Sequence, residues 1–110
     1  MASPSEPITV IISHRLGRDE AKRRIERALG AIRREIAPFA KSIEYGWQDY
    51  RLDFRLTVLA QHVAGRIDVY DDSVRVEFTL PRLLHLLARP IAARIQQRGL
   101  GVLEPPKDNT

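Results

Sequence analysis

With 110 residues the chain has room for one hydrophobic core, so a single fold must carry the function. Hydrophobic residues make up 44% and charged residues 29% of the sequence, which argues against a disordered chain, and a net charge of +4 favours anionic partners only weakly. The absence of cysteine excludes disulfide bonds, thiolate catalysis and cysteine-ligated zinc, and it suits a reducing cytoplasm.

Both ends of the sequence predict tails outside the folded unit, because the start is small and polar and prolines 105 and 106 oppose helix and sheet. We expect a disordered N-terminal tail at 1–6, a single α+β domain at 7–101 and a flexible C-terminal tail at 102–110. The start lacks a basic and apolar leader pattern, and no apolar run is long enough to span a bilayer. We therefore expect neither an export signal nor a transmembrane segment.

The first two elements are a strand and a helix. Residues 8–13 are apolar and β-branched, which predicts a strand inside a sheet. From Arg18 to about residue 40 the apolar residues recur at helical spacing, which predicts a long amphipathic helix. Asp19 and Glu20 complement the positive end of its dipole, and Pro38 marks its expected end.

Alternating apolar and polar residues in the middle of the chain predict consecutive antiparallel hairpins. A turn at residues 71–72 places Asp68 opposite Arg75, a complementary charge pair. A second turn at 61–62 places Arg55 opposite Asp68, and a third lies near 48–49. One face of the hairpins is charged; the expected members of the other, apolar face are Ile43, Tyr45, Leu52, Phe54, Leu56, Val58, Ile67, Val69, Val74 and Val76.

After Leu80 the sequence turns helical again. Pro90 either begins the last helix or kinks a longer one, and Gly99 is its expected C-cap. The sequence thus predicts an α+β fold of order β-α-β-β-β-β-α, with one antiparallel-rich sheet and two helices packed on one face. The place of the first strand in the sheet stays open.

No catalytic or metal-binding pattern is present in the sequence. His14, His62 and His85 are isolated, the serines lack a nucleophile elbow, and the glycines are scattered rather than gathered into a phosphate loop. We therefore expect a protein that is not an enzyme, needs no cofactor and holds no metal.

Three features could serve binding, and each also has a purely structural explanation. A leucine-dense segment is either core or a contact with a partner, a second copy or a hydrophobic surface; its members are Leu83, Leu84, Leu86 and Leu87. Arginines of the first helix are either anion contacts or a solvated face; the candidates are Arg23, Arg24, Arg27 and Arg34. Two aromatic residues form either a ligand rim or a core rim; they are Trp47 and Tyr50.

Short motifs carry a family resemblance over roughly residues 8–97; they are His14-x-Leu16-Gly17-x-x-Glu20-Ala21-x-x-Arg24, Gly65-Arg66-Ile67-x-Val69-x-Asp71-Asp72 and Pro90-Ile91 after the leucines. The sequence resembles the small bacterial polyhydroxyalkanoic acid system proteins, encoded near polyhydroxyalkanoate granule genes. The resemblance implies a cytoplasmic accessory protein that associates with storage granules or their proteins. It transfers no functional residue.

Three functions stay open from the sequence. The leading hypothesis is the non-enzymatic granule accessory protein. The alternative is a small helix-grip-like domain that encloses a lipid or another hydrophobic ligand, which requires a cavity between sheet and helices. Nucleic-acid binding through the basic first helix ranks third, because acidic residues accompany the arginines.

Overall fold

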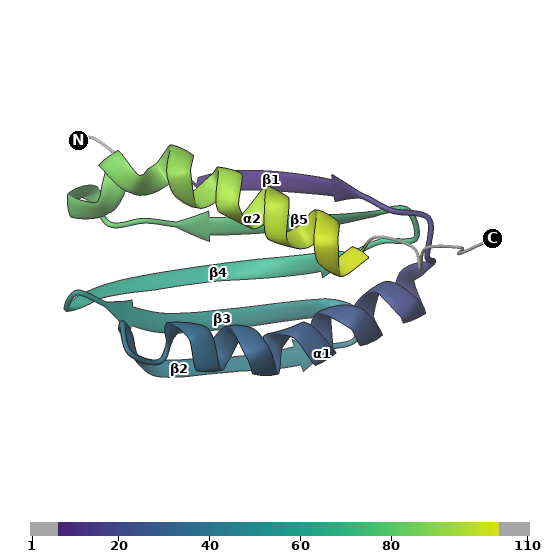
Figure 1. The fold of residues 1–110 in the computed structure, drawn as a ribbon, viewed down its shortest axis with the longest axis horizontal. Helices are drawn as coiled ribbons and strands as arrows, with labels where there is room; N and C mark the ends of the chain where they lie inside the picture. The colour runs from purple at the N-terminus through teal and green to yellow at the C-terminus, as the bar shows by residue number, and fades with distance from the viewer. Residues whose placement is uncertain (1–6, 104–110) are drawn as a thin grey trace.

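The computed structural model describes residues 7–103, apart from the side chain of Leu83, and consists of one sheet with its helices on one face (Figure 1). In chain order the elements are β1 (Pro7–Ser13), α1 (Arg18–Ile36), β2 (Ala40–Gln48), β3 (Arg51–Val58), β4 (Gln61–Val69), β5 (Ser73–Thr79), the 3-10 helix η1 (Arg82–Leu87) and α2 (Ala88–Leu103). The predicted α+β order is confirmed. The predicted tail residues 1–6 and 104–110 lie outside the described part.

The five strands are all antiparallel and lie in the order β1-β5-β4-β3-β2, so the first strand pairs with β5. The predicted β4–β5 hairpin is confirmed in its register, with Asp68 opposite Arg75 and Arg66 opposite Glu77. Arg66 Nη2 lies 2.8 Å from Glu77 Oε1, so the charged face of this hairpin is held by a cross-strand ion pair.

The predicted turn between β3 and β4 is wrong by two residues. It is formed by Leu59 and Ala60, at φ 52° and 65°, and not by residues 61–62. Asp68 consequently lies opposite Arg51 rather than Arg55. Two positive φ values suit a tight hairpin turn but are costly for leucine and alanine. Because these residues are not typical of such a turn, the sequence does not indicate its position. A shift of two residues keeps every side chain on its predicted face.

The β2–β3 turn is centred one residue later than predicted, on Asp49 and Tyr50, and Asp49 takes the left-handed φ of 55°. Trp47 lies opposite Leu52, on the expected shared face. The pairing is interrupted by an irregularity between Lys41 and Glu44.

α1 ends where its proline predicts, whereas α2 ends later than predicted. α1 ends at Ile36, just before Pro38, as the proline predicts. α2 begins at Ala88, so Pro90 lies in its first turn, where proline costs no helical hydrogen bond, and not in its interior. Gly99 is not a C-cap, because α2 continues to Leu103, which is 3% exposed and therefore belongs to the folded unit beyond the predicted boundary at 101.

Gly99 instead lets α2 approach β1 closely. A Cβ at this position would lie 2.2 Å from Ile12 Cδ1, so any side chain here would force the Ile12 side chain to move or the helix to withdraw. Within residues 7–103, no helix combines the length and the apolar character that a bilayer crossing requires.

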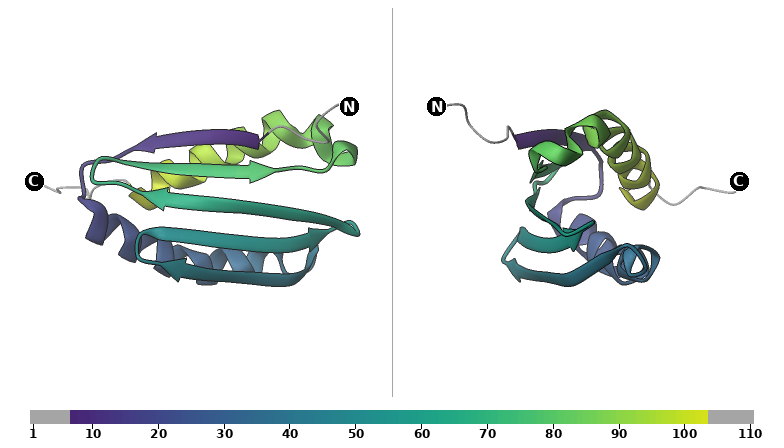
Figure 2. Two further views of the ribbon diagram at one scale, coloured as in Figure 1. Left: turned by 180° about the vertical axis from the view of Figure 1, so that it is seen from behind. Right: turned by 90° about the vertical axis from the view of Figure 1, so that its left-hand side faces the viewer.

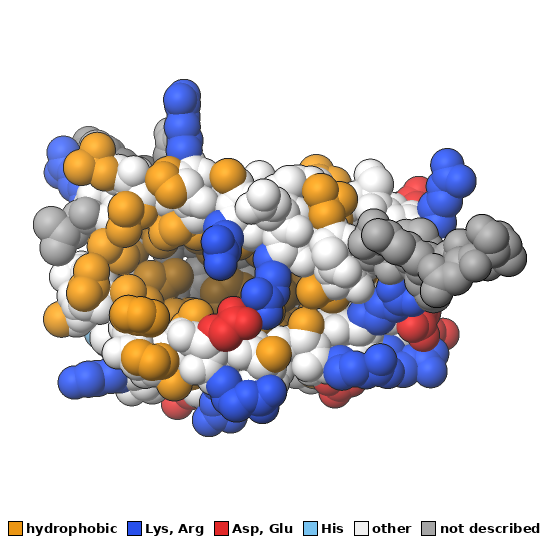
Figure 3. Space-filling model, in the orientation of Figure 1, with side chains coloured by type: hydrophobic (Ala, Val, Ile, Leu, Met, Phe, Trp, Pro, Cys, Tyr) orange, Lys and Arg blue, Asp and Glu red, His pale blue; other side chains and the backbone are white. Residues whose placement is uncertain are grey.

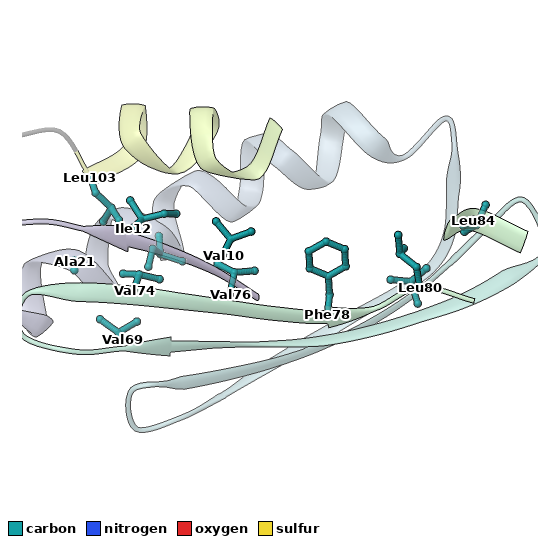
Figure 4. Close-up of a cluster of buried hydrophobic side chains, with 12 residues drawn as sticks. Val10, Ile12, Ala21, Val69, Val74, Val76, Phe78, Leu80, Leu84 and Leu103 are labelled. Atoms are coloured by element: carbon teal, nitrogen blue, oxygen red, sulfur yellow. The ribbon is translucent and has the colours of Figure 1, made fainter. Parts of the chain in front are cut away.

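The packed core lies on one half of the sheet. Figure 4 shows buried side chains of β1 and β5, including Val10, Val76 and Phe78, with Leu103 of α2 beside them. Figure 2 shows the same asymmetry end on, with α2 near β1 and β5 and α1 near β2 and β3. The two helices therefore cover different parts of the same sheet face.

Candidate functional site: an apolar groove under the helices

A cavity of about 530 Å³ lies between the sheet and the two helices and opens to solvent between them. Figure 3 looks onto this opening, where hydrophobic side chains line a hollow. The wall is formed by apolar residues of the strands and of the inward stripes of α1 and α2; its strand residues are Ile12, Ile43, Tyr45, Leu52, Phe54, Leu56, Ile67, Val74 and Val76. Of the ten residues expected on the apolar face, all but Val58 and Val69 line it.

The sequence builds the groove by placing small residues where helix and sheet face each other. On α1 the inward stripe includes Ile25, Leu29 and Ile32, but Ala28 shares this stripe and fills little space. On the sheet, Gly65 lies beneath the ring of Phe54, and a Cβ there would be 2.3 Å from Phe54 Cζ. The phenyl ring of Phe54, which lines the groove, therefore packs directly over a glycine.

Four charged side chains also line the groove, and all four belong to the helices: Arg33 and Glu35 on α1, and Arg94 and Arg98 on α2. Arg98 Nη2 donates to Glu35 Oε2 at 2.8 Å, which joins the two helices at the opening. The groove thus has an apolar interior and a charged edge. Sequence reasoning did not select these residues; the signal available was a pair of arginines four residues apart on the stripe of the last helix.

The aromatic pair Trp47 and Tyr50 lies outside the groove lining and fastens α1 to the β2–β3 hairpin. Tyr50 Oη donates to Asp19 Oδ1 at 2.6 Å, and this hydrogen bond raises the pKa of the phenol. Lys22 Nζ lies 4.9 Å from the centre of the Trp47 ring and donates to Asp49 O at 2.6 Å. These contacts hold α1 against the β2–β3 hairpin, which is a structural role.

The four candidate arginines of α1 do not line the groove either. Arg23 and Arg24 both pair with Glu20, at 3.0 Å each. The hydrogen bond from Arg24, followed by the charges of neighbouring arginines, lowers the pKa of this carboxyl. Arg27 and Arg34 are exposed.

The leucine-rich segment divides between core and surface. Leu84 is buried, whereas Leu86 is 94% and Leu87 44% exposed; the side chain of Leu83 lies outside the described part. Two further exposed apolar side chains, Phe39 and Leu59, lie at 72% and 70%.

These exposed residues share one end of the molecule. Ala40 pairs with Val58, so the adjoining Phe39 and Leu59 lie at the same end of the sheet. Figure 1 shows the β3–β4 turn and the α1–β2 connection at this end, and η1 at the same end on the side of β1 and β5. We call Phe39, Leu59, Leu86 and Leu87 the apolar end; Phe39 also lines the groove. This surface could be found only in part from the sequence, through its leucines.

The three histidines lie at separate places in the fold and form no cluster. His14 accepts a hydrogen bond at Nδ1 from the Leu16 N–H, so its Nε2 carries the proton and donates to Tyr70 O; both distances are 3.1 Å. His62 lies beside Thr57 and His85 beside the Leu80 carbonyl. Among residues 7–103 no group of three histidine or acidic side chains could hold a metal ion.

His14 therefore ties the β1–α1 loop to the β4–β5 turn. Its backbone N–H also donates to Asp72 O at 2.9 Å, and Arg18 lies 3.6 Å from Asp71 Oδ1. Two of the motifs that carry the family resemblance thus meet in space, and their contacts stabilise the fold.

Fold and groove define the class: a small α+β domain whose single antiparallel sheet and two helices surround an apolar groove. The chain belongs to the family described as "Putative polyhydroxyalkanoic acid system protein", whose model matches residues 8–101. This confirms the resemblance noted in the sequence.

A solved structure has a similar fold. It is described as the crystal structure of the di-domain ARO/CYC BexL from the BE-7585A biosynthetic pathway, with a TM-score of 0.56 and 14% sequence identity. The match covers 94% of this chain and 52% of that one, so this chain spans about half of its length. At this identity the likeness shows the fold alone. No curated protein matches the sequence.

Proposed function

We propose that this protein is a non-enzymatic accessory protein of the polyhydroxyalkanoate system that binds an apolar ligand, such as an acyl chain, in the groove beneath its helices. The observation that carries the proposal is the cavity of about 530 Å³, a size typical of small-molecule sites. Apolar walls left without neighbours forfeit dispersion energy, and a bound chain restores those contacts. Membership of the polyhydroxyalkanoic acid system family supports a role in that system, and with it a cytoplasmic location.

The composition of the wall favours binding over reaction. Among the described residues that line the groove, Glu35 is the one carboxylate, and it is paired with Arg98. A general base must be free to take a proton from its substrate, and a carboxylate held in an ion pair at the edge is poorly suited to that role. We therefore propose that the ligand is held and released unchanged.

Filling the groove tests this proposal. Ala28→Phe places a ring on the inward stripe of α1, and Ala31→Phe is the matched control, because Ala31 is also half-buried on α1 but does not line the groove. We expect the wild type and Ala31→Phe to bind a fluorescent acyl-chain probe with one site, and Ala28→Phe to lose most of that binding while still unfolding cooperatively. Equal binding by the two variants would refute the site.

The apolar end supports a second candidate function, attachment to the surface of a polyhydroxyalkanoate granule. Large apolar side chains that remain exposed together often mark a contact surface, and this one adjoins the opening of the groove through Phe39. A hydrophobic polyester matches its chemistry.

Co-sedimentation with isolated granules or amorphous polymer tests the attachment. We expect the wild type in the pellet and Leu86→Ser largely in the supernatant. Leu100→Ser is the matched control, since Leu100 is 50% exposed on α2 and lies outside the apolar end. A wild type that stays in the supernatant would exclude the attachment.

Nucleic-acid binding has less support, because Arg23 and Arg24 already pair with Glu20. We expect no mobility shift of duplex DNA at micromolar protein, and a salt-sensitive shift would restore that function as a candidate.

A further inference from the structure

The charged side chains at the edge of the groove comprise three arginines and one glutamate, so positive charge is in excess there. Arg94 and Arg98 are one turn apart on α2, so both lie on the same flank of that helix. Only Arg98 has an ion-pair partner there, Glu35; within residues 7–103 no carboxylate pairs with Arg94. Figure 3 shows basic and acidic side chains gathered beside the hollow between the helices. Arg33 of α1 also lines the groove without a carboxylate partner among these residues, so two guanidinium groups, those of Arg94 and Arg33, stand at the edge without a counter-charge.

The interior beyond this edge offers no charge to match it, and its strand residues are apolar apart from the hydroxyl of Tyr45. The strand residues of the wall carry no charge, and the inward stripe of α1 near the opening is aliphatic, as in Ile32 and Ile36. A ligand that fills the groove thus meets mainly apolar side chains inside and guanidinium groups at the edge. Guanidinium groups bind carboxylates through two parallel hydrogen bonds, and an adjoining apolar surface strengthens such pairs.

We infer that the ligand is an amphiphile, an acyl chain ending in a carboxylate, whose chain fills the groove and whose carboxylate binds Arg94 beside the Arg98–Glu35 pair. This inference rests on the proposed function and names its ligand class. The Arg98–Glu35 pair joins the two helices at the opening, and Glu35 neutralises Arg98. The uncompensated charges offered to the ligand are those of Arg94 and Arg33, and Arg94 is the one that lies beside the pair on α2. A neutral ester of the same chain gains the apolar contacts but not the ion pair.

The test compares dodecanoate with methyl dodecanoate as competitors of the acyl-chain probe, below their aggregation concentrations. For the wild type we expect dodecanoate to bind about three- to tenfold more tightly than the ester, since charge-assisted bonds at an exposed edge are modest. Arg94→Gln should abolish this preference and leave the affinity for the ester unchanged. Arg89→Gln, which removes an exposed arginine of α2 outside the groove lining, should keep the preference.

The outcomes separate the inference from the proposed function. Equal affinity of the wild type for acid and ester would overturn the carboxylate and leave the apolar site standing. An equal loss of both ligands in Arg94→Gln would also overturn it, because that pattern reports a structural role. A wild type that binds neither compound would contradict the proposed function itself.

Discussion

Replacing Gly65 by alanine tests whether the wall of the groove depends on a ring packed over a glycine. A Cβ at this position would lie 2.3 Å from Phe54 Cζ and 2.7 Å from the Glu77 carbonyl oxygen. Carbon atoms in good contact are about 3.5–4.0 Å apart, so the ring must move by more than an ångström. The carbonyl belongs to the backbone of β5 and cannot yield without disturbing the β4–β5 ladder.

Overpacking of this kind costs about 1–3 kcal/mol. In a domain of this size, each kcal/mol lowers the midpoint of thermal unfolding by about 4–8 °C. We therefore expect Gly65→Ala to unfold at a lower urea concentration and a lower temperature, measured by far-ultraviolet circular dichroism. Because Phe54 lines the groove, a displaced ring alters the wall, and we also expect weaker binding of the acyl-chain probe.

Two further variants make the result specific. Gly46→Ala is the matched control: Gly46 lies in β2, and an added Cβ meets nothing within 4 Å, so its free energy of unfolding should hold or rise slightly. In a Phe54→Leu background the clash with the ring is relieved, so the cost of Gly65→Ala should shrink. A Gly65→Ala protein as stable as the Gly46→Ala protein would refute the reasoning.

Two other predictions follow from contacts outside the groove. His14→Ala removes the acceptor of the Leu16 N–H and the donor to Tyr70 O, so urea unfolding should show a loss of about 1–3 kcal/mol, and an unchanged midpoint would contradict this role. Tyr50 has a raised pKa in the folded state because it donates to Asp19, so this contact stabilises the fold below the ordinary tyrosine pKa and is lost as pH rises through the folded value. Urea titrations at rising alkaline pH should show a stability loss in the wild type that is smaller in Tyr50→Phe, and identical curves would contradict it.

The sequence predicted those parts of the fold in which local chemistry and pairing agree. The β4–β5 hairpin was predicted in register because turn acids and two complementary charge pairs indicate the same alignment. The β3–β4 turn was misplaced because Leu59 and Ala60 adopt positive φ values that sequence patterns assign to glycine or asparagine. The end of α2 was misplaced because Gly99 serves a close approach to β1, a property of tertiary packing.

From the sequence, the groove could be predicted only as an apolar face of the sheet. Whether that face encloses a cavity depends on the distance between the sheet and the two helices, which is a property of tertiary packing. The leucines show the same limit: a dense run suggests burial and contact equally, and only the path of η1 buries Leu84 while it exposes Leu86. Arg94 was missed for a related reason, since an arginine on a helical stripe is ordinarily solvated.

A methyl-labelled nuclear magnetic resonance titration with dodecanoate tests the central claim most directly, because it locates the ligand. Our account predicts that shifts concentrate on methyl groups that line the groove, such as those of Leu29, Ile32 and Leu56, while those of the packed core, such as Val10 and Leu84, change little. Shifts confined to the exposed leucines of η1, Leu86 and Leu87, or no shift at saturating ligand, would contradict it.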